Sequence, residues 1–217
     1  ISSSSLHPNL IRWLAAYLRG QSACCIYQSA RSPKMIIHSG NPQGVTSPDI
    51  YNFFVSDFPE VAPLTESYAD DFELAESSPV IQTISANLTS DLAHVSKWSA
   101  DKNLSIAPNK SSVTLFTPDT KQSQCHPQAF LDGVLIPLKK NPKILGVTFD
   151  TFLNFSYHIK DICARIASRL QILKALAGTS WGQQKETLLI TFKCLILSII
   201  NYAAPIWFPN ASKTSIA

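Results

Sequence analysis

Two adjacent aspartates, Asp70 and Asp71, are the sequence feature that most constrains how this chain folds. They stand between two short runs of strand-like composition, residues 61–67 and 72–75, which predicts a β-hairpin with both carboxylates at or next to its tip. Like charges side by side repel each other, and a fold keeps them together most readily when a divalent cation neutralises them. The alternative is an acidic turn exposed to solvent, and the rest of the sequence has to decide between the two.

The charge distribution favours a polyanionic partner. The 217 residues carry a formal net charge of +3, but residues 1–48 contain no Asp or Glu and do contain Arg12, Arg19, Arg31 and Lys34. A basic segment followed by an acidic turn suits a phosphate-rich ligand held against metal ions. The hydrophobic content of 45% allows a packed core and argues against a disordered chain.

Cysteine usage and hydropathy predict an intracellular protein without a membrane span. The five cysteines form no Cys-x-x-Cys pair, so we expect reduced thiols that contribute to packing. Residues 188–208 are strongly apolar, but Lys193, Asn201 and Pro205 interrupt them, which favours a buried helix over a transmembrane one. The chain begins at Ile1 without a signal-peptide pattern, and we expect it to be a fragment of a longer protein.

The predicted elements give an α+β fold. Ser47, Ser78 and Ser156 are expected helix N-caps, and Asp132-Gly133 between apolar runs predicts a second hairpin. Gly146 interrupts a predicted strand and marks a bulge or a close approach. Apolar periodicity predicts helices over residues 10–18, 48–58, 80–103, 156–178 and 184–202, and strands over residues 24–27, 34–37, 104–106, 112–116, 129–131, 134–136 and 144–149.

Two further features have both a plain and a functional interpretation. The loop of residues 39–48, with Gly40 and Gly44, leads into a helix N-terminus, where unpaired backbone N–H groups can bind an anion; an ordinary loop-to-helix junction looks the same. The predicted helix of residues 156–178 has cations on its polar side. These form either a solvated face or a track along a nucleic-acid backbone.

Four motifs, taken in order, resemble one enzyme family. They are Gly40-x-Pro42-Gln43-Gly44 followed by Ser47-Pro48, then Tyr68-Ala69-Asp70-Asp71, then Trp98 with Lys110, and then Leu145-Gly146-Val147. Together they are similar to the reverse transcriptases, or RNA-directed DNA polymerases, of non-LTR retrotransposons, in particular the jockey-like lineage. The match runs over nearly all of the chain. Residues 202–207 also resemble the region that follows the polymerase in these elements.

The resemblance implies a right-hand polymerase. Residues 1–150 would form the palm, a small antiparallel sheet packed on helices, without the fingers and the first catalytic motif, and residues 151–217 would form a helical, thumb-like connection region. It implies an RNA template, a DNA primer, deoxynucleoside triphosphates and two Mg²⁺ ions, with Mn²⁺ as an alternative, about 3.5–4 Å apart. The missing fingers and an endonuclease would belong to the same polyprotein. An active element would work in the nucleus and cytoplasm.

The resemblance also implies roles for single residues. Asp70 would be the principal metal ligand and Asp71 a secondary one, with Tyr68 near the primer terminus. Gln43 and Gly44 would line the nucleotide and template side. Three more roles concern the second half of the chain. Lys110 would protonate pyrophosphate, and Gly146 would lie in the primer grip. The helix that carries Lys160, Arg165 and Arg169 would face the duplex backbone.

Two departures from the family pattern weaken the expectation of activity. The segment between Gly44 and Ser47 is one residue shorter than usual, which favours a decayed copy or a variant loop. The family's first catalytic Asp precedes the Pro-Gln-Gly motif, yet the first acidic residue of this chain is Asp49. We therefore predict no polymerase activity for these 217 residues alone. The open alternatives are a piece of an active enzyme, a decayed copy, a non-catalytic nucleic-acid-binding module, and an unrelated α+β protein with an acidic turn.

Overall fold

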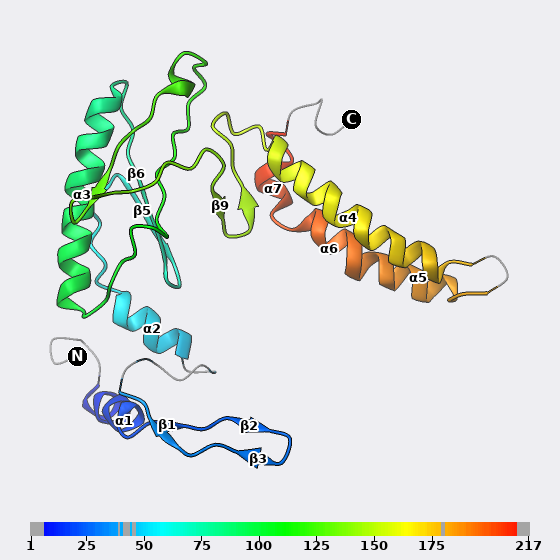
Figure 1. Cartoon of the computed structure of the whole chain (residues 1–217), viewed down its shortest axis with the longest axis horizontal. Helices are drawn as coiled ribbons and strands as arrows, with labels where there is room; N and C mark the ends of the chain where they lie inside the picture. The colour runs from blue at the N-terminus through cyan, green and yellow to red at the C-terminus, as the bar shows by residue number, and fades with distance from the viewer. Residues whose placement is uncertain (1–6, 39, 41–43, 45–46, 179–180, 212–217) are drawn as a thin grey trace. The chain divides into compact units, whose positions relative to one another are not determined.

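The computed structural model describes residues 7–38, 40, 44, 47–178 and 181–211 (Figure 1). The chain is α+β, as predicted, and its sheets are small, antiparallel and two-stranded. It divides into two compact units. Unit 1 comprises Ile1–Phe58 and Glu66–Glu73, and unit 2 comprises Pro59–Thr65 and Leu74–Ala217. The predicted division into palm and thumb-like parts after residue 150 remains a prediction.

Unit 1 begins with the predicted first helix and a bent ribbon of strands. Helix α1 spans Pro8–Leu18, and Gly20 follows it with a φ of +66°. Two strands were predicted next, but the ribbon has four, because the chain turns at Gln28 (φ +52°) and places residues 30–31 in a strand where a polar loop was expected. Strand β1 (Ser22–Ala23) pairs with β4 (Met35–Ile36), and β2 (Ile26–Tyr27) pairs with β3 (Ala30–Arg31).

The rest of unit 1 contains helix α2 and the tip of the predicted aspartate hairpin, whose outer strand ends belong to unit 2. Helix α2 spans Ser47–Val55 and ends three residues earlier than predicted. Strands β5 (Leu64–Tyr68) and β6 (Asp71–Ala75) pair with each other, which confirms the hairpin. Phe58 stacks on Phe72 with ring centres 4.2 Å apart, so an aromatic contact holds the end of the α2 segment against β6.

The first part of unit 2 is a long helix packed on a hairpin. Helix α3 spans Ile81–Asp101, with Val80 rather than Ser78 at the N-cap, since the Ser78 hydroxyl accepts from the Val80 amide instead. The hairpin of β7 (Phe130–Leu131) and β8 (Val134–Leu135) forms at Asp132-Gly133 as predicted. A core cluster lies between helix and hairpin and contains the buried residues Val113, Ala129, Leu131 and Ile136.

Three strand predictions in unit 2 were wrong. Residues 104–106 form no strand, and residues 112–116 contribute only an isolated bridge from Val113 to Leu138. The expected strand of residues 144–149 is a hairpin of β9 (Lys143–Ile144) and β10 (Val147–Thr148), because Leu145 and Gly146 both take positive φ angles, +44° and +84°. Two consecutive left-handed residues reverse the chain and end a strand.

The last part of unit 2 is a pair of helices with a small cap. Figure 1 shows α4 (Ser156–Leu176) running beside the chain segment of α5 (Lys185–Phe192) and α6 (Ser198–Asn201), and these elements are in contact. A π-helical segment, Lys193–Leu197, joins α5 to α6, and α7 (Ala204–Trp207) follows. Ser156 is not the N-cap of α4: Phe155 occupies that position with a φ of +56°.

The packing of this part differs from the predictions in two ways. Residues 184–202 were expected to be buried, but Ile190 is 62% exposed, since only one face of the segment meets α4. The core cluster here contains Val147, Phe155, Ile159, Ile162, Ile199 and Trp207. The cysteines are free thiols, but they are not packed inside as expected: four are exposed and Cys24 is half-buried. No helix in the described part of the chain is long and apolar enough to cross a membrane.

Candidate functional site

The two predicted metal ligands lie together at the tip of the β5–β6 hairpin. Ala69 and Asp70 form the turn, Asp71 is the first residue of β6, and both aspartates are exposed. Ala69 has a φ of +55°, a left-handed conformation that costs a residue with a Cβ roughly 1–2 kcal/mol. Pairing of the flanking strands must therefore hold this turn in its left-handed conformation, with both carboxylates at the tip.

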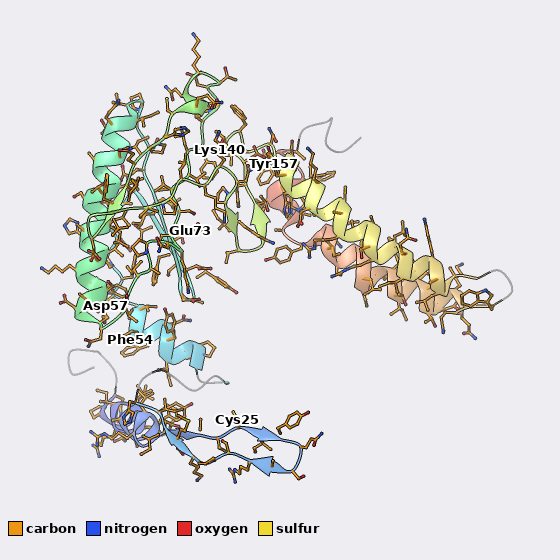
Figure 2. The ribbon with its side chains drawn as sticks, viewed as in Figure 1. Cys25, Phe54, Asp57, Glu73, Lys140 and Tyr157 are labelled. Carbon is orange, nitrogen blue, oxygen red and sulfur yellow. The ribbon has the colours of Figure 1, made fainter. Side chains whose placement is uncertain are left out.

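The tip is strongly acidic. Figure 2 shows Glu73 on β6, two residues after Asp71 and hence on the same face of the strand. The pKa of the Glu73 carboxyl is raised, first by burial and then by the negative charges of Asp71 and Glu66. The negative charge of the tip also acts on Tyr51 of α2, because burial and then the charge of Asp70 raise the pKa of its phenol. These effects indicate a local negative potential that a cation would relieve.

The tip supplies only part of a metal site. Carboxylate oxygens are the ligands that Mg²⁺ prefers, and the Asp70–Asp71 pair offers them to solvent. Within the described ranges, no group of three or more His, Cys, Asp or Glu side chains lies close enough to hold a metal ion. The donor chemistry therefore fits a divalent cation, while the number of protein ligands falls short of a closed site.

The other predicted residues of unit 1 lie on the surface. Tyr68, the last residue of β5, is 66% exposed. Gly44 is exposed, and a Cβ built on it would meet no atom within 4 Å, so a ligand has steric access to its backbone. Gln43 lies outside the described residues, and its predicted role remains a prediction.

The remaining predicted residues belong to unit 2. Lys110 is exposed in a turn, where its backbone amide donates to the Ala107 carbonyl at 3.0 Å. Lys110 and Asp70 thus belong to different units. Gly146 makes the predicted close approach: a Cβ there would lie 3.2 Å from Cε1 of Tyr202.

The three predicted cations on α4 have different surroundings. Lys160 is exposed, with its Nζ 5.8 Å from the ring centre of Tyr157, which Figure 2 shows near the start of α4. Arg165 forms an exposed ion pair with Asp161 at 3.6 Å, which contributes little to stability. Arg169 is half-buried and donates from Nη1 to the Leu195 carbonyl at 3.0 Å. Arg169 therefore also has a structural role, because it links α4 to the π segment. A residue that served only to contact a nucleic-acid backbone would not need this bond.

Sequence reasoning missed two polar residues that shape this part of unit 2. Asp150 is buried, and its Oδ1 accepts hydrogen bonds from the backbone amides of Phe152 and Asn154, which orders the loop before α4. An Asp side chain commonly bonds the amide two residues later in a turn, and this spacing is the sequence signal that could have identified Asp150. His158 is only 2% exposed, and its Nδ1 accepts from the Thr148 amide at 3.3 Å. No sequence pattern identified His158, because its partner lies on the β9–β10 hairpin.

The tail of residues 202–207 has a structural role. The Tyr202 hydroxyl donates to the Leu145 carbonyl at 2.6 Å, and the Trp207 indole donates to the Tyr202 carbonyl at 3.0 Å. Trp207 is buried in the core cluster next to His158, with ring centres 5.8 Å apart. The tail thus anchors the end of α6 to the hairpin that carries Gly146.

Comparison with known proteins finds several relatives of one kind. The chain is 24% identical over 216 residues, 95% of its length, to the RNA-directed DNA polymerase from mobile element jockey of Drosophila funebris. It is 28% identical over 94% of its length to a probable RNA-directed DNA polymerase from transposon BS of Drosophila melanogaster. A jockey polymerase of D. melanogaster is 34% identical over 146 residues, 63% of this chain.

The extent of these matches is limited. The chain spans about a quarter of the length of the first two relatives, 23% in each case. No family model matches the sequence. No solved structure matches the chain. Several relatives agree over most of the chain, at 24–34% identity. By sequence the chain is therefore similar to the RNA-directed DNA polymerases, or reverse transcriptases, of jockey-like and other non-LTR mobile elements.

Proposed function

We propose that this chain is part of a polymerase that extends a DNA primer on an RNA template with deoxynucleoside triphosphates. The observation that carries the proposal is the β5–β6 turn, which places Asp70 and Asp71 on adjacent exposed positions. The relatives named as RNA-directed DNA polymerases support the same activity. In the proposed reaction the primer 3′-oxygen attacks the α-phosphorus, a phosphodiester bond forms, and pyrophosphate leaves.

The acidic tip would hold the divalent cations of this reaction. Asp70 is proposed as the principal ligand and Asp71 as the secondary one, and Mg²⁺ bound there would supply charge stabilisation to the attacking and leaving oxygens. Tyr68, exposed at the end of β5, would offer its ring to the primer terminus. Gly44, with open space above its backbone, would line the nucleotide side together with Gln43.

The residues of unit 2 would act on the leaving group and on the duplex. Lys110 is proposed to donate a proton to the departing pyrophosphate. Gly146, in the β9–β10 turn, is proposed to lie in the primer grip. Three cations of α4, Lys160, Arg165 and Arg169, would contact backbone phosphates, which helps to position a duplex without reading its sequence. Residues 1–150 would then be palm and residues 151–217 thumb-like.

We further propose that the 217 residues do not polymerise alone. The reason is the donor count: residues 1–48 contain no carboxylate, and the described residues bring no third ligand to the tip. A primer-extension assay with Mg²⁺ or Mn²⁺ should therefore show no incorporation. Metal-dependent incorporation that Asp70→Ala abolishes would overturn this part of the proposal.

Metal binding tests the assignment of Asp70 directly. Paramagnetic Mn²⁺ added to the isotopically labelled chain should broaden the NMR signals of residues 68–73, and Asp70→Asn should weaken this effect. Asp132→Asn is a matched control, because Asp132 also lies in a hairpin turn but follows Leu131 and precedes Gly133. Equal broadening in wild type and Asp70→Asn would argue for an ordinary acidic turn.

A second candidate is a nucleic-acid-binding remnant without catalysis. It is favoured by the cations of α4, which do not depend on the acidic tip. Binding of an RNA–DNA duplex that weakens steeply with salt, together with no Mn²⁺ binding at Asp70, would select this candidate.

A further inference from the structure

A cavity of about 210 Å³ in unit 2 has a lining rich in hydrogen-bond donors. Its polar walls come from α4, which contributes His158, Arg165 and Arg169, and from the segment after the π helix, which contributes Ser198 and Tyr202. Water occupies roughly 30 Å³ per molecule in the liquid, so the space holds several waters and therefore a tetrahedral oxyanion. What the cavity binds depends on which of these groups still have hydrogen-bonding capacity.

His158 presents a donor without a partner. The Thr148 amide donates to its Nδ1, so the neutral ring must carry its proton on Nε2. Nε2 is buried and has no hydrogen-bond partner among the described residues. Burial lowers the pKa of the ring, and the positive charges of Arg165 and Lys143 act in the same direction while Asp161 opposes them. A buried N–H without an acceptor costs about 1–3 kcal/mol, which an acceptor in the cavity would remove.

The two arginines add positive charge on the same wall. Each guanidinium has five N–H donors. Arg169 is known to use one nitrogen for the Leu195 carbonyl, and Arg165 meets Asp161 at 3.6 Å on the exposed side. The carboxylate of Asp161 therefore neutralises only part of the positive charge of the two arginines. The hydroxyls do not compete as donors, since Ser198 donates to the Cys194 carbonyl and Tyr202 to that of Leu145.

We propose that this cavity binds a single phosphate group, held by the guanidinium groups of Arg165 and Arg169 and by the Nε2–H of His158. Planar guanidinium groups match the oxygens of a phosphate, and hydrogen bonds to a charged group are stronger than those to water. The phosphate comes from the backbone of a bound nucleic acid, and this choice of source rests on the proposed function. His158 is thereby assigned as a binding residue.

The site itself can be tested with inorganic phosphate and the full chain. At constant ionic strength, added phosphate should shift the ring NMR signals of His158 until they saturate. His158→Asn keeps an oxygen that can accept from the Thr148 amide but removes the Nε2 donor, and it should weaken phosphate binding at least about tenfold, the loss of one hydrogen bond to a charged group. His158→Gln, whose longer amide returns a donor near the Nε2 position, should recover part of the affinity.

The matched comparison is between two cations on one helix. Arg169→Gln removes a cavity cation, and Lys174→Gln removes an exposed cation of α4 that does not line the cavity. Circular dichroism would check that each variant is folded. We expect Arg169→Gln to weaken phosphate binding at least about tenfold and Lys174→Gln to change it less than twofold. A shift that does not saturate, or equal losses in both variants, would overturn the site.

An RNA–DNA duplex of defined length identifies the source of the phosphate. If the backbone occupies the cavity, His158→Asn and Arg169→Gln should weaken duplex binding more than Lys174→Gln does, and the duplex should displace inorganic phosphate. Phosphate binding without duplex binding would keep the site, overturn its nucleic-acid source and count against the proposed function. Duplex binding that all variants retain, with no phosphate site, would leave the proposed function standing and refute the cavity.

Discussion

The acidic tip of the β5–β6 hairpin and the basic cavity beside α4 both bring like charges close together, but by different means. At the tip, Asp70 and Asp71 are neighbours in the chain, and a two-residue turn exposes both. At the cavity, Arg165 and Arg169 are one helical turn apart, and side chains of α4 and of the segment after the π helix complete the walls, among them the buried Ile162 and Ile199. Covalent connectivity therefore maintains the first arrangement, while tertiary packing maintains the second.

This difference predicts different responses to substitution. The tip should tolerate changes without loss of fold, since its side chains are exposed and the Phe58–Phe72 stack lies to one side of it. The cavity should be lost whenever the packing beneath it is lost.

Trp207→Ala should cause the largest loss. Trp207 is buried in the core cluster next to the cavity, and removing a buried aromatic ring costs about 3–5 kcal/mol of the free energy of unfolding. Trp181→Ala is the matched control, because this tryptophan is 66% exposed and its removal should cost well under 1 kcal/mol. Urea unfolding followed by circular dichroism measures both. Similar losses would show that the cluster does not hold this part of unit 2 together.

Gly146→Ala should destabilise the chain more than Gly133→Ala. Both glycines follow another left-handed residue in a hairpin turn, with φ of +84° and +75°, so both substitutions cost about 1–2 kcal/mol in backbone strain. Only at Gly146 would the new methyl group lie 3.2 Å from the Tyr202 ring. The difference between the two free energies of unfolding, about 1 kcal/mol or more, therefore reports the contact between turn and tail. No difference would mean that Tyr202 moves aside freely.

Stability should fall on acidification through His158. Burial lowers the pKa of the folded ring below its ordinary value of 6.5, so below that pH the unfolded chain binds a proton that the folded chain resists. The contribution is fully present above pH 6.5 and is lost as the pH falls through the lower folded pKa. Urea unfolding between pH 7.5 and 5.5 should show this slope in wild type and a flatter one in His158→Asn. Equal slopes in wild type and His158→Asn would show that the His158 ring is more solvated than the structure indicates.

Two substitutions at the tip should give the smallest and most local effects. Asp71→Asn should lower the pKa of Glu73, and Asp70→Asn should lower that of Tyr51, because each removes a negative charge that raises the respective pKa. Neither change should return the pKa to its ordinary value, since burial is the larger cause in both. NMR titration of the two side chains measures the shifts. A crossed pattern, with Asp70→Asn acting mainly on Glu73, would contradict the geometry of the turn.

The contrast also explains what could be predicted from the sequence. The aspartate hairpin, the Asp132-Gly133 turn, α1 and α3 depend on local signals, and the structure has all of them. The long helices were identified by periodicity, but their N-caps at Ser78 and Ser156 were wrong, because Val80 and Phe155 occupy those positions. Local hydrogen bonds of neighbouring residues decided the caps.

The cavity could not be predicted because its residues meet through tertiary packing. The sequence pattern places Arg165 and Arg169 on one face of a helix, but no local signal places His158 or Tyr202 beside them. The split of residues 144–149 into a hairpin had the same origin: the turn at Gly146 fits against Tyr202, which is 56 residues away in the chain. Non-local partners of this kind leave no periodic signal.

The π segment of residues 193–197 ties the cavity to the exact length of the chain. An α-helix turns by about 100° per residue, so a helix that holds one residue more or less presents a different face downstream. Removing one codon here, for example that of the exposed Cys194, would leave a more regular helix. It would also rotate Ile199 out of the core and Tyr202 away from the Gly146 turn. Such an in-frame loss would preserve the reading frame and still remove the proposed phosphate site.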